Sequence, residues 1–89
     1  MRAGLLVDIG RNQLDLKAFD DAARTFDLAA REKPGSPWEA DAMLGSAKAL
    51  RNQGKAAEAR RVLEALTKRY KGSAAADEAA RLLADTSGG

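Results

Sequence analysis

The chain contains no cysteine and no histidine. Without cysteine it has no disulfide and no thiolate nucleophile, and without either residue it lacks the usual zinc ligands and every imidazole base. Aromatic residues make up only 4% of the 89 residues, so surfaces for stacking nucleic-acid bases are scarce. No apolar run approaches the roughly 18 residues that a membrane-spanning helix needs. These absences exclude most catalytic classes and predict no membrane insertion.

The acidic residues and glycines that are present do not form a recognisable catalytic or cofactor motif. Asp20 and Asp21 are adjacent, so they point to different faces of a helix and do not make a carboxylate pair. The GSPWEA stretch at residues 35–40 lacks the glycine spacing and the lysine of a phosphate-binding loop. Acidic clusters with metal-ligand spacing are absent as well. We therefore expect no enzymatic activity, no metal and no cofactor.

Alanine supplies much of the apolar content and outnumbers Leu, Ile, Val and Phe combined. Because alanine has the highest helix propensity and the net charge is only +2, we expect a closely packed helical protein rather than a disordered chain. The length fits one small domain or a fragment of a larger protein. The start, MRAGLLVDIG, makes a poor signal peptide, which favours the cytoplasm; a periplasmic location stays open if the chain is a fragment.

The sequence pI of about 9.2 raises the question of nucleic-acid binding. Several basic residues, however, follow an acidic residue by four positions, which is the favourable order for ion pairs on a helix surface. These pairs are Asp20/Arg24, Asp27/Arg31, Glu64/Lys68 and Asp77/Arg81. A solvated helix face accounts for them better than a phosphate-binding stripe, so nucleic acid is not the expected partner. The basic residues that would serve a nucleic-acid-binding module are Arg60, Arg61, Lys68, Arg69 and Lys71.

Apolar residues recur at helical spacing in five segments, and no segment has the alternation of a strand. The expected fold class is therefore all-α, with five helices joined by short links. In the first segment the spacing predicts a buried face comprising Leu6, Ile9, Gln13 and Leu16.

The clearest break between helices is KPGSPWEA at residues 33–40. Pro34-Gly35 ends one helix, because proline cannot continue it and glycine suits the left-handed turn that follows. Ser36 is expected to cap the next helix through its side chain, with Pro37 at the first helical position. Glu39 would complete a capping box.

The break at residues 33–40 returns in a weaker form, KGSAAADEA, at residues 71–79. A shift of 37 residues also aligns Ala22 with Ala59 and Phe26 with Leu63. A helix pair repeated at a fixed period is the signature of an α-solenoid. We expect one repeat at about residues 3–35, a second at about 36–72, a capping helix at about 73–85 and a flexible tail at 86–89.

The pattern of small and aromatic residues resembles the tetratricopeptide repeat. The first repeat carries Leu6, Ile9, Gly10, Ala22, Phe26, Ala29 and Pro34, and the second Met43, Ala47, Leu50, Gly54, Ala59, Leu63 and Leu66. Gly10 opposite Ala22, and Ala47 opposite Ala59, would let the helices approach while Phe26 and Leu63 fill the gaps between pairs. The period is longer than usual, as in repeats of bacterial envelope proteins, and Lys17 stands where the family has a glycine.

This resemblance implies a non-catalytic module that binds another protein in a concave groove. In the family's register the groove would be lined by Val7, Arg11, Leu14, Leu44, Lys48, Arg51, Asn52 and Arg81. Apolar contact surface flanked by cations suits an acidic or C-terminal peptide, or a helix, of the partner. The alternative is that these residues are ordinary solvated side chains on a small scaffold.

Other functions stay open at this point. Leu5, Leu6 and Val7 crowd the start of the chain, and at least about three repeats are generally needed for stability. A self-associating structural domain, a homodimer included, is therefore the main alternative, and a nucleic-acid-binding module is the second. Trp38 is interpreted as a brace of the inter-repeat turn near Leu28 rather than as an exposed anchor for a partner.

Overall fold

The computed structural model describes residues 2–88, with side chains for residues 2–85. Its helices are α1 (Arg2–Asp15), α2 (Phe19–Glu32), α3 (Pro37–Asn52), α4 (Ala56–Arg69) and α5 (Ala74–Gly88). The five expected helices are thus confirmed, and the described residues contain no strand. α5 is longer than the expected 73–85 because no proline or glycine interrupts residues 74–87. The remaining residue of the expected tail, Gly89, lies outside the described residues.

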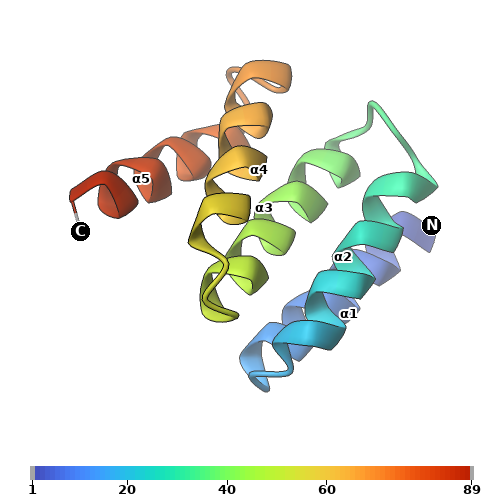
Figure 1. The fold of residues 1–89 in the computed structure, drawn as a ribbon. Coiled ribbons are helices and arrows are strands. Elements are labelled where there is room, and N and C mark those ends of the chain that lie inside the picture. Colours follow the sequence, from blue (N-terminus) through green and yellow to red (C-terminus); the bar gives the residue numbers. More distant parts are fainter. Residues whose placement is uncertain (1, 89) are drawn as a thin grey trace.

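Consecutive helices pack against one another in a row (Figure 1). α1 pairs with α2, α3 lies between α2 and α4, and α5 follows against α4. α3 also contacts α1 and α5, so it is the one helix that packs against all four others within residues 2–88. Two helix pairs followed by a single helix agree with the expected all-α architecture.

Phe26 of α2 fills the space where the first helix pair meets α3. Its ring is buried and lies against two glycines, Gly10 of α1 and Gly45 of α3. A Cβ atom built at Gly10 would come within 2.7 Å of the ring, and one built at Gly45 within 2.3 Å. Carbon atoms do not approach so closely, so neither position accepts a side chain unless the helices move apart. The sequence predicted where Phe26 lies but did not identify Gly45.

The second helix pair has a related core 37 residues later. Leu63 occupies the position of Phe26 and is buried together with Leu66 of α4. Their neighbours include Ala47 of α3 and Ala79 of α5, small residues that allow the helices to lie close together. The 37-residue periodicity of the sequence is therefore repeated in the packing.

The buried face of α1 differs from the expected one. Ala3, Val7 and Gly10 are buried, whereas Ile9 is exposed and Leu16 retains 78% of its accessible surface. The expected face followed the largest side chains, but close approach of α2 and α3 requires small residues on α1. The prediction for Ile9 and Leu16 was therefore wrong.

The turns that end α1 and α3 have the same hydrogen bonds. The N–H of Ala18 donates to the carbonyl oxygen of Gln13 at 2.8 Å, and the N–H of Lys55 to that of Leu50 at 2.9 Å. These six-residue bonds belong to Schellman motifs, in which the preceding residue adopts a left-handed conformation. That residue is Gly54 after α3, with φ 81°, but Lys17 after α1, with φ 63°. Lys17 thus occupies a conformation that a residue with a Cβ adopts at a cost.

The expected side-chain cap at α3 is wrong. Ser36 stands at the N-cap position, but its hydroxyl donates to the carbonyl oxygen of Lys33 at 2.6 Å and makes no capping bond to α3. Glu39 accepts from the N–H of Gly35 at 2.8 Å, one residue before the N–H that a capping box would use. At the equivalent position 37 residues later, Ser73 does cap α5, because its hydroxyl oxygen accepts the backbone N–H of Ala76 at 3.1 Å.

Trp38 packs against α1. A Cβ atom at Gly4 would lie 3.2 Å from the ring of Trp38. The ring is partly buried beside the cluster that we call the first core, which consists of Val7, Ala22, Phe26, Ala29, Ala42 and Ala49. Leu28, which we expected beneath it, is exposed. The bracing role of Trp38 stays a prediction, and its observed neighbour is Gly4 of α1.

Glu39 ties the start of α3 to the end of α4 and is the only buried charged residue within the described part of the chain. Besides Gly35, it accepts a hydrogen bond from the hydroxyl of Tyr70, and it lies 3.2 Å from Arg69 (Oε2–Nη1). Burial by itself raises the pKa of Glu39, but the bonds from Gly35 and Tyr70 and the charge of Arg69 outweigh it, so the pKa is lowered. The bond to Glu39 raises the pKa of Tyr70.

Lys17→Gly should stabilise the protein by about 0.5–1 kcal/mol, because glycine adopts the left-handed conformation without strain. The matched change in the second repeat, Gly54→Lys, should destabilise it by about 1 kcal/mol for the opposite reason. Denaturant unfolding of both variants gives the two free energies. A loss of stability in Lys17→Gly would show that the lysine side chain contributes more than its backbone strain costs.

Glu39→Gln should reduce the acid sensitivity of folding. Since the pKa of Glu39 is lower in the folded state, its stabilising contribution is complete above the ordinary glutamate pKa of about 4.3. That contribution is lost as the pH falls through the folded-state pKa, a loss that the variant should not show.

Tyr70 is the single tyrosine, so tyrosinate absorbance reports its titration directly. The pKa of Tyr70 should fall in Glu39→Gln; an unchanged pKa would contradict the hydrogen bond.

Candidate functional site

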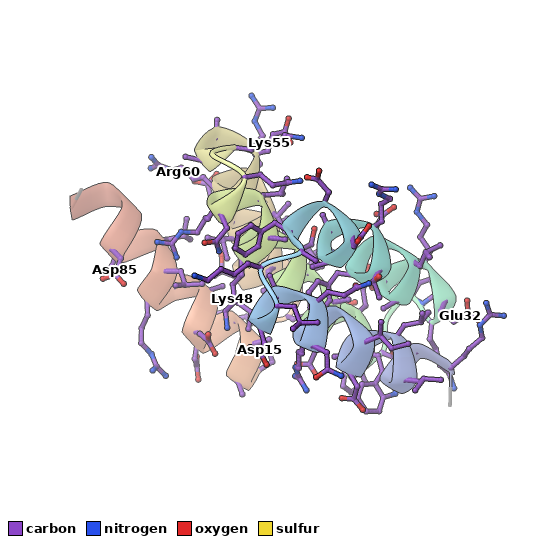
Figure 2. All side chains as sticks on the ribbon, turned by 90° about the horizontal axis from the view of Figure 1, so that it is seen from below. Asp15, Glu32, Lys48, Lys55, Arg60 and Asp85 are labelled. Carbon is purple, nitrogen blue, oxygen red and sulfur yellow. The ribbon has the colours of Figure 1, made fainter. Side chains whose placement is uncertain are left out.

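A groove of about 640 Å³ lies between α1, α3 and α5. Its lining residues come from the end of α1, the turn after it, α2, α3 and α5. They are Arg11, Leu14, Asp15, Lys17, Phe19, Lys48, Arg51, Asn52 and Leu82. We call this hollow the α1–α3–α5 groove. Figure 2 shows Lys48 in the middle of this side of the molecule, between α5 and the end of α1.

A smaller hollow of about 250 Å³ continues the groove toward the first core. It shares Arg11, Leu14 and Lys48 with the groove and adds Leu44 and Glu78. Phe26 and Gly45 form part of its lining as well. The close packing of α1, α2 and α3 around Phe26 therefore forms the inner end of the recess.

Six of the eight residues that the family register assigned to a groove lie together in these two hollows. They are Arg11, Leu14, Leu44, Lys48, Arg51 and Asn52. Val7 does not line a groove, because it is fully buried in the first core beside Phe26; its assignment is corrected here. Arg81 is exposed on α5 and lines neither hollow.

Two cations of the groove pair with acidic residues: Arg11 of α1 with one on α3, and Lys48 of α3 with one on α5. The Nη2 atom of Arg11 lies 4.0 Å from the Oδ2 atom of Asp41 on α3, and its Nη1 atom lies 3.8 Å from Asp8. The Nζ atom of Lys48 lies 2.6 Å from the Oε2 atom of Glu78 on α5. Arg51, by contrast, has no ion pair with any described residue.

These ion pairs are equivalent under the 37-residue repeat. Arg11 aligns with Lys48, and Asp41 aligns with Glu78. Because each acid follows its cation at the same distance along the chain, the repeat could have predicted both pairs. Both ion pairs were missed because only acid–base spacing within a single helix was considered. The apolar residues Phe19 and Leu82 were also missed. Phe19 lies on α2, a second helix that the register does not cover, and on α5 the register assigned Arg81 instead of its neighbour Leu82.

The ion pairs predicted within helices are only partly present. Arg31 lies 2.9 Å from Asp27, as expected. Arg24 instead pairs with Asp21 at 3.9 Å, and Glu64 pairs with Arg60 at 3.7 Å. Asp20, the expected partner of Arg24, accepts a hydrogen bond from the side chain of Gln53.

The basic residues of α4 lie away from the groove. Lys55 and Arg60 are at the opposite edge from Asp15 in Figure 2. Two of the cations considered for nucleic acid are engaged in ion pairs, Arg60 with Glu64 and Arg69 with Glu39. Arg69 also lies over the ring of Tyr70, 5.4 Å from its centroid.

The described residues offer neither a cluster of metal ligands nor a membrane-spanning helix. They contain no group of three or more acidic side chains that could hold a metal ion. Nor does any helix among residues 2–88 have the length and apolar character needed to cross a membrane.

The first helix pair carries a second exposed feature. Leu5 and Ile9 of α1, Leu16 of the turn after it and Leu28 of α2 all have large exposed surfaces. Leu5 aligns under the repeat with Ala42 of α3, which is buried in the first core. The outer face of α1 thus holds exposed apolar residues where the equivalent face of α3 is covered.

One comparison with known proteins gives a match. Residues 41–73 match the family model for the tetratricopeptide repeat, a segment that covers most of α3, all of α4 and the turn before α5. No curated protein and no solved structure matches the chain. Tetratricopeptide repeats are generally protein–protein interaction modules, and no enzyme family matches. The chain therefore contains a tetratricopeptide repeat at residues 41–73, followed by the helix α5.

Proposed function

We propose that the protein binds an extended peptide or a helix of a partner protein in the α1–α3–α5 groove, without catalysing a reaction. The observation that carries the proposal is the meeting of apolar and cationic side chains in one hollow of about 640 Å³. Leu14, Phe19 and Leu82 offer apolar contact, and Arg51 and Asn52 offer hydrogen-bond donors beside it. A tetratricopeptide repeat supports protein binding in general.

The charge of the lining favours an acidic segment of the partner. Arg51 has no carboxylate partner within the described residues, so its guanidinium is available for a bidentate bond to a ligand carboxylate. Apolar side chains of the same segment would displace water from Leu14 and Leu82. A peptide that combines acidic and apolar residues would use both kinds of contact.

The test is charge reversal in the groove. The double variant Lys48→Glu, Arg51→Glu should weaken binding of a fluorescein-labelled peptide of alternating glutamate and leucine, the probe peptide, at least about tenfold. The matched control is Arg60→Glu, Arg61→Glu, which changes the net charge equally on α4. It should change the affinity much less, because neither residue lines the groove.

The dependence on salt distinguishes a charged groove from general adhesion. The difference between the two double variants should shrink as ionic strength rises, because salt screens partly exposed charges. If the α4 variant loses binding while the groove variant keeps it, the groove proposal fails and α4 is the binding surface.

Self-association is the second candidate function, and the exposed residues of α1 favour it. Leu5 of α1 and Leu16 of the turn after it expose 60% and 78% of their surface. A second copy of the chain could cover them. A molar mass in light scattering that rises with protein concentration, and that Leu5→Glu abolishes, would support this function; a constant monomer mass would exclude it.

A further inference from the structure

We propose that Glu78 is an internal competitor for the groove: its carboxylate occupies Lys48 and so lowers the affinity of the groove for acidic ligands. The proposal rests on the function proposed above for the same groove. Glu78 and Lys48 face each other at 2.6 Å and both line the inner hollow. An ammonium already bonded to one carboxylate gains less from a second, because the second carboxylate meets a neutralised pair and the repulsion of Glu78.

The position of the pair allows a ligand to reach it. The side chains of Lys48 and Glu78 retain 38% and 42% of their accessible surface. Exchange of Glu78 for a ligand carboxylate thus requires only side-chain rotation, without opening of the helix row. Lys48 also borders the main groove next to Arg51 and Asn52. A ligand that binds Arg51 is therefore in position to contact Lys48.

Glu78 is not needed to hold α5 in place. α5 packs on α3 and α4 through Ala75 and Ala79, both buried in the second core with Leu63 and Leu66. A partly exposed ion pair contributes little to stability beside such apolar packing. Removal of the charge of Glu78 should therefore leave the fold intact, and its effect on binding can be measured by itself.

The two equivalent ion pairs also distinguish the cations of the groove that have an acidic partner from those that have none among the described residues. Asp41 meets Arg11 and Glu78 meets Lys48, whereas no described acidic residue pairs with Arg51. An acidic ligand therefore meets cations without an ion pair to any described residue at Arg51 and Lys17, and it competes with Glu78 for Lys48. Glu78 is in this sense a specificity-determining residue: it disfavours a second acidic group in the ligand.

Glu78→Gln should bind the probe peptide about two- to fivefold more tightly than the unmodified chain at low salt, measured by fluorescence anisotropy. The gain should decrease as salt is added. The control is Asp85→Asn, which removes the same charge from the same helix at a residue that lines neither hollow. In Figure 2, Asp85 lies toward the far end of α5 from Lys48. Circular dichroism checks that both variants are folded.

An unchanged affinity in Glu78→Gln overturns the inference, and so does an equal gain in Asp85→Asn, which would reflect net charge alone. Absence of probe binding by both the unmodified chain and Glu78→Gln also overturns it. The proposed function is tested separately by the Lys48→Glu, Arg51→Glu variant. If that variant loses binding while Glu78→Gln gains none, the groove stands and only the competition by Glu78 is rejected.

Discussion

The contact of one phenylalanine ring with two glycines determines how closely the helices of this protein approach. Phe26 lies between Gly10 of α1 and Gly45 of α3, where no side chain fits. α1 and α3 therefore approach each other over the phenylalanine ring, which belongs to α2. This approach brings Arg11 and Leu14 of α1 to the same recess as Lys48 of α3. The groove depends on the packing beneath it.

The second repeat has a related arrangement, with a leucine in place of the phenylalanine and alanines at the helix contacts, and it carries the groove toward α5. Leu63 takes the position of the phenylalanine, and Ala47 and Ala79 allow the approach of α3 and α5. α1 is aligned with α3 in the same way as α3 is aligned with α5. Arg11 of α1 pairs with Asp41 of α3, and the equivalent Lys48 of α3 pairs with Glu78 of α5. Surface charge and core packing thus follow one period. The repeat supplies both Arg11 and Lys48 and the acidic residues that pair with them.

The sequence predicted the features that follow from residue spacing along the chain. It did not predict the features that depend on how neighbouring helices are placed against one another. Five helices, the position of Phe26 and the breaks at Gly35 and Gly72 follow from periodicity and turn chemistry, and the structure has them. The exposure of Leu16 and the burial of Val7 could not be read from α1 alone, because the two neighbouring helices select its buried face. Ser36 does not cap α3 through its side chain, because its hydroxyl donates to the carbonyl oxygen of Lys33 in the preceding turn.

The groove was predictable to the extent that it lies on the first helix of each pair. Arg11, Lys48 and Arg51 are on that helix, and the family register assigned them. Phe19 comes from α2, so the same register omits it. Val7 shows the limit of a register: it assigns positions along a helix but does not fix the rotation of that helix against its neighbours.

A double-mutant cycle between Phe26 and Gly45 tests most directly whether this contact sets the helix spacing. Gly45→Ala alone should destabilise the protein by about 1–3 kcal/mol, because its methyl group would meet the ring. In a Phe26→Leu background the same change should cost much less, since leucine lacks the ring atoms that a Cβ at Gly45 would approach at 2.3 Å. The account predicts this strong coupling in the free energy of unfolding. Additive effects of the two substitutions would contradict it.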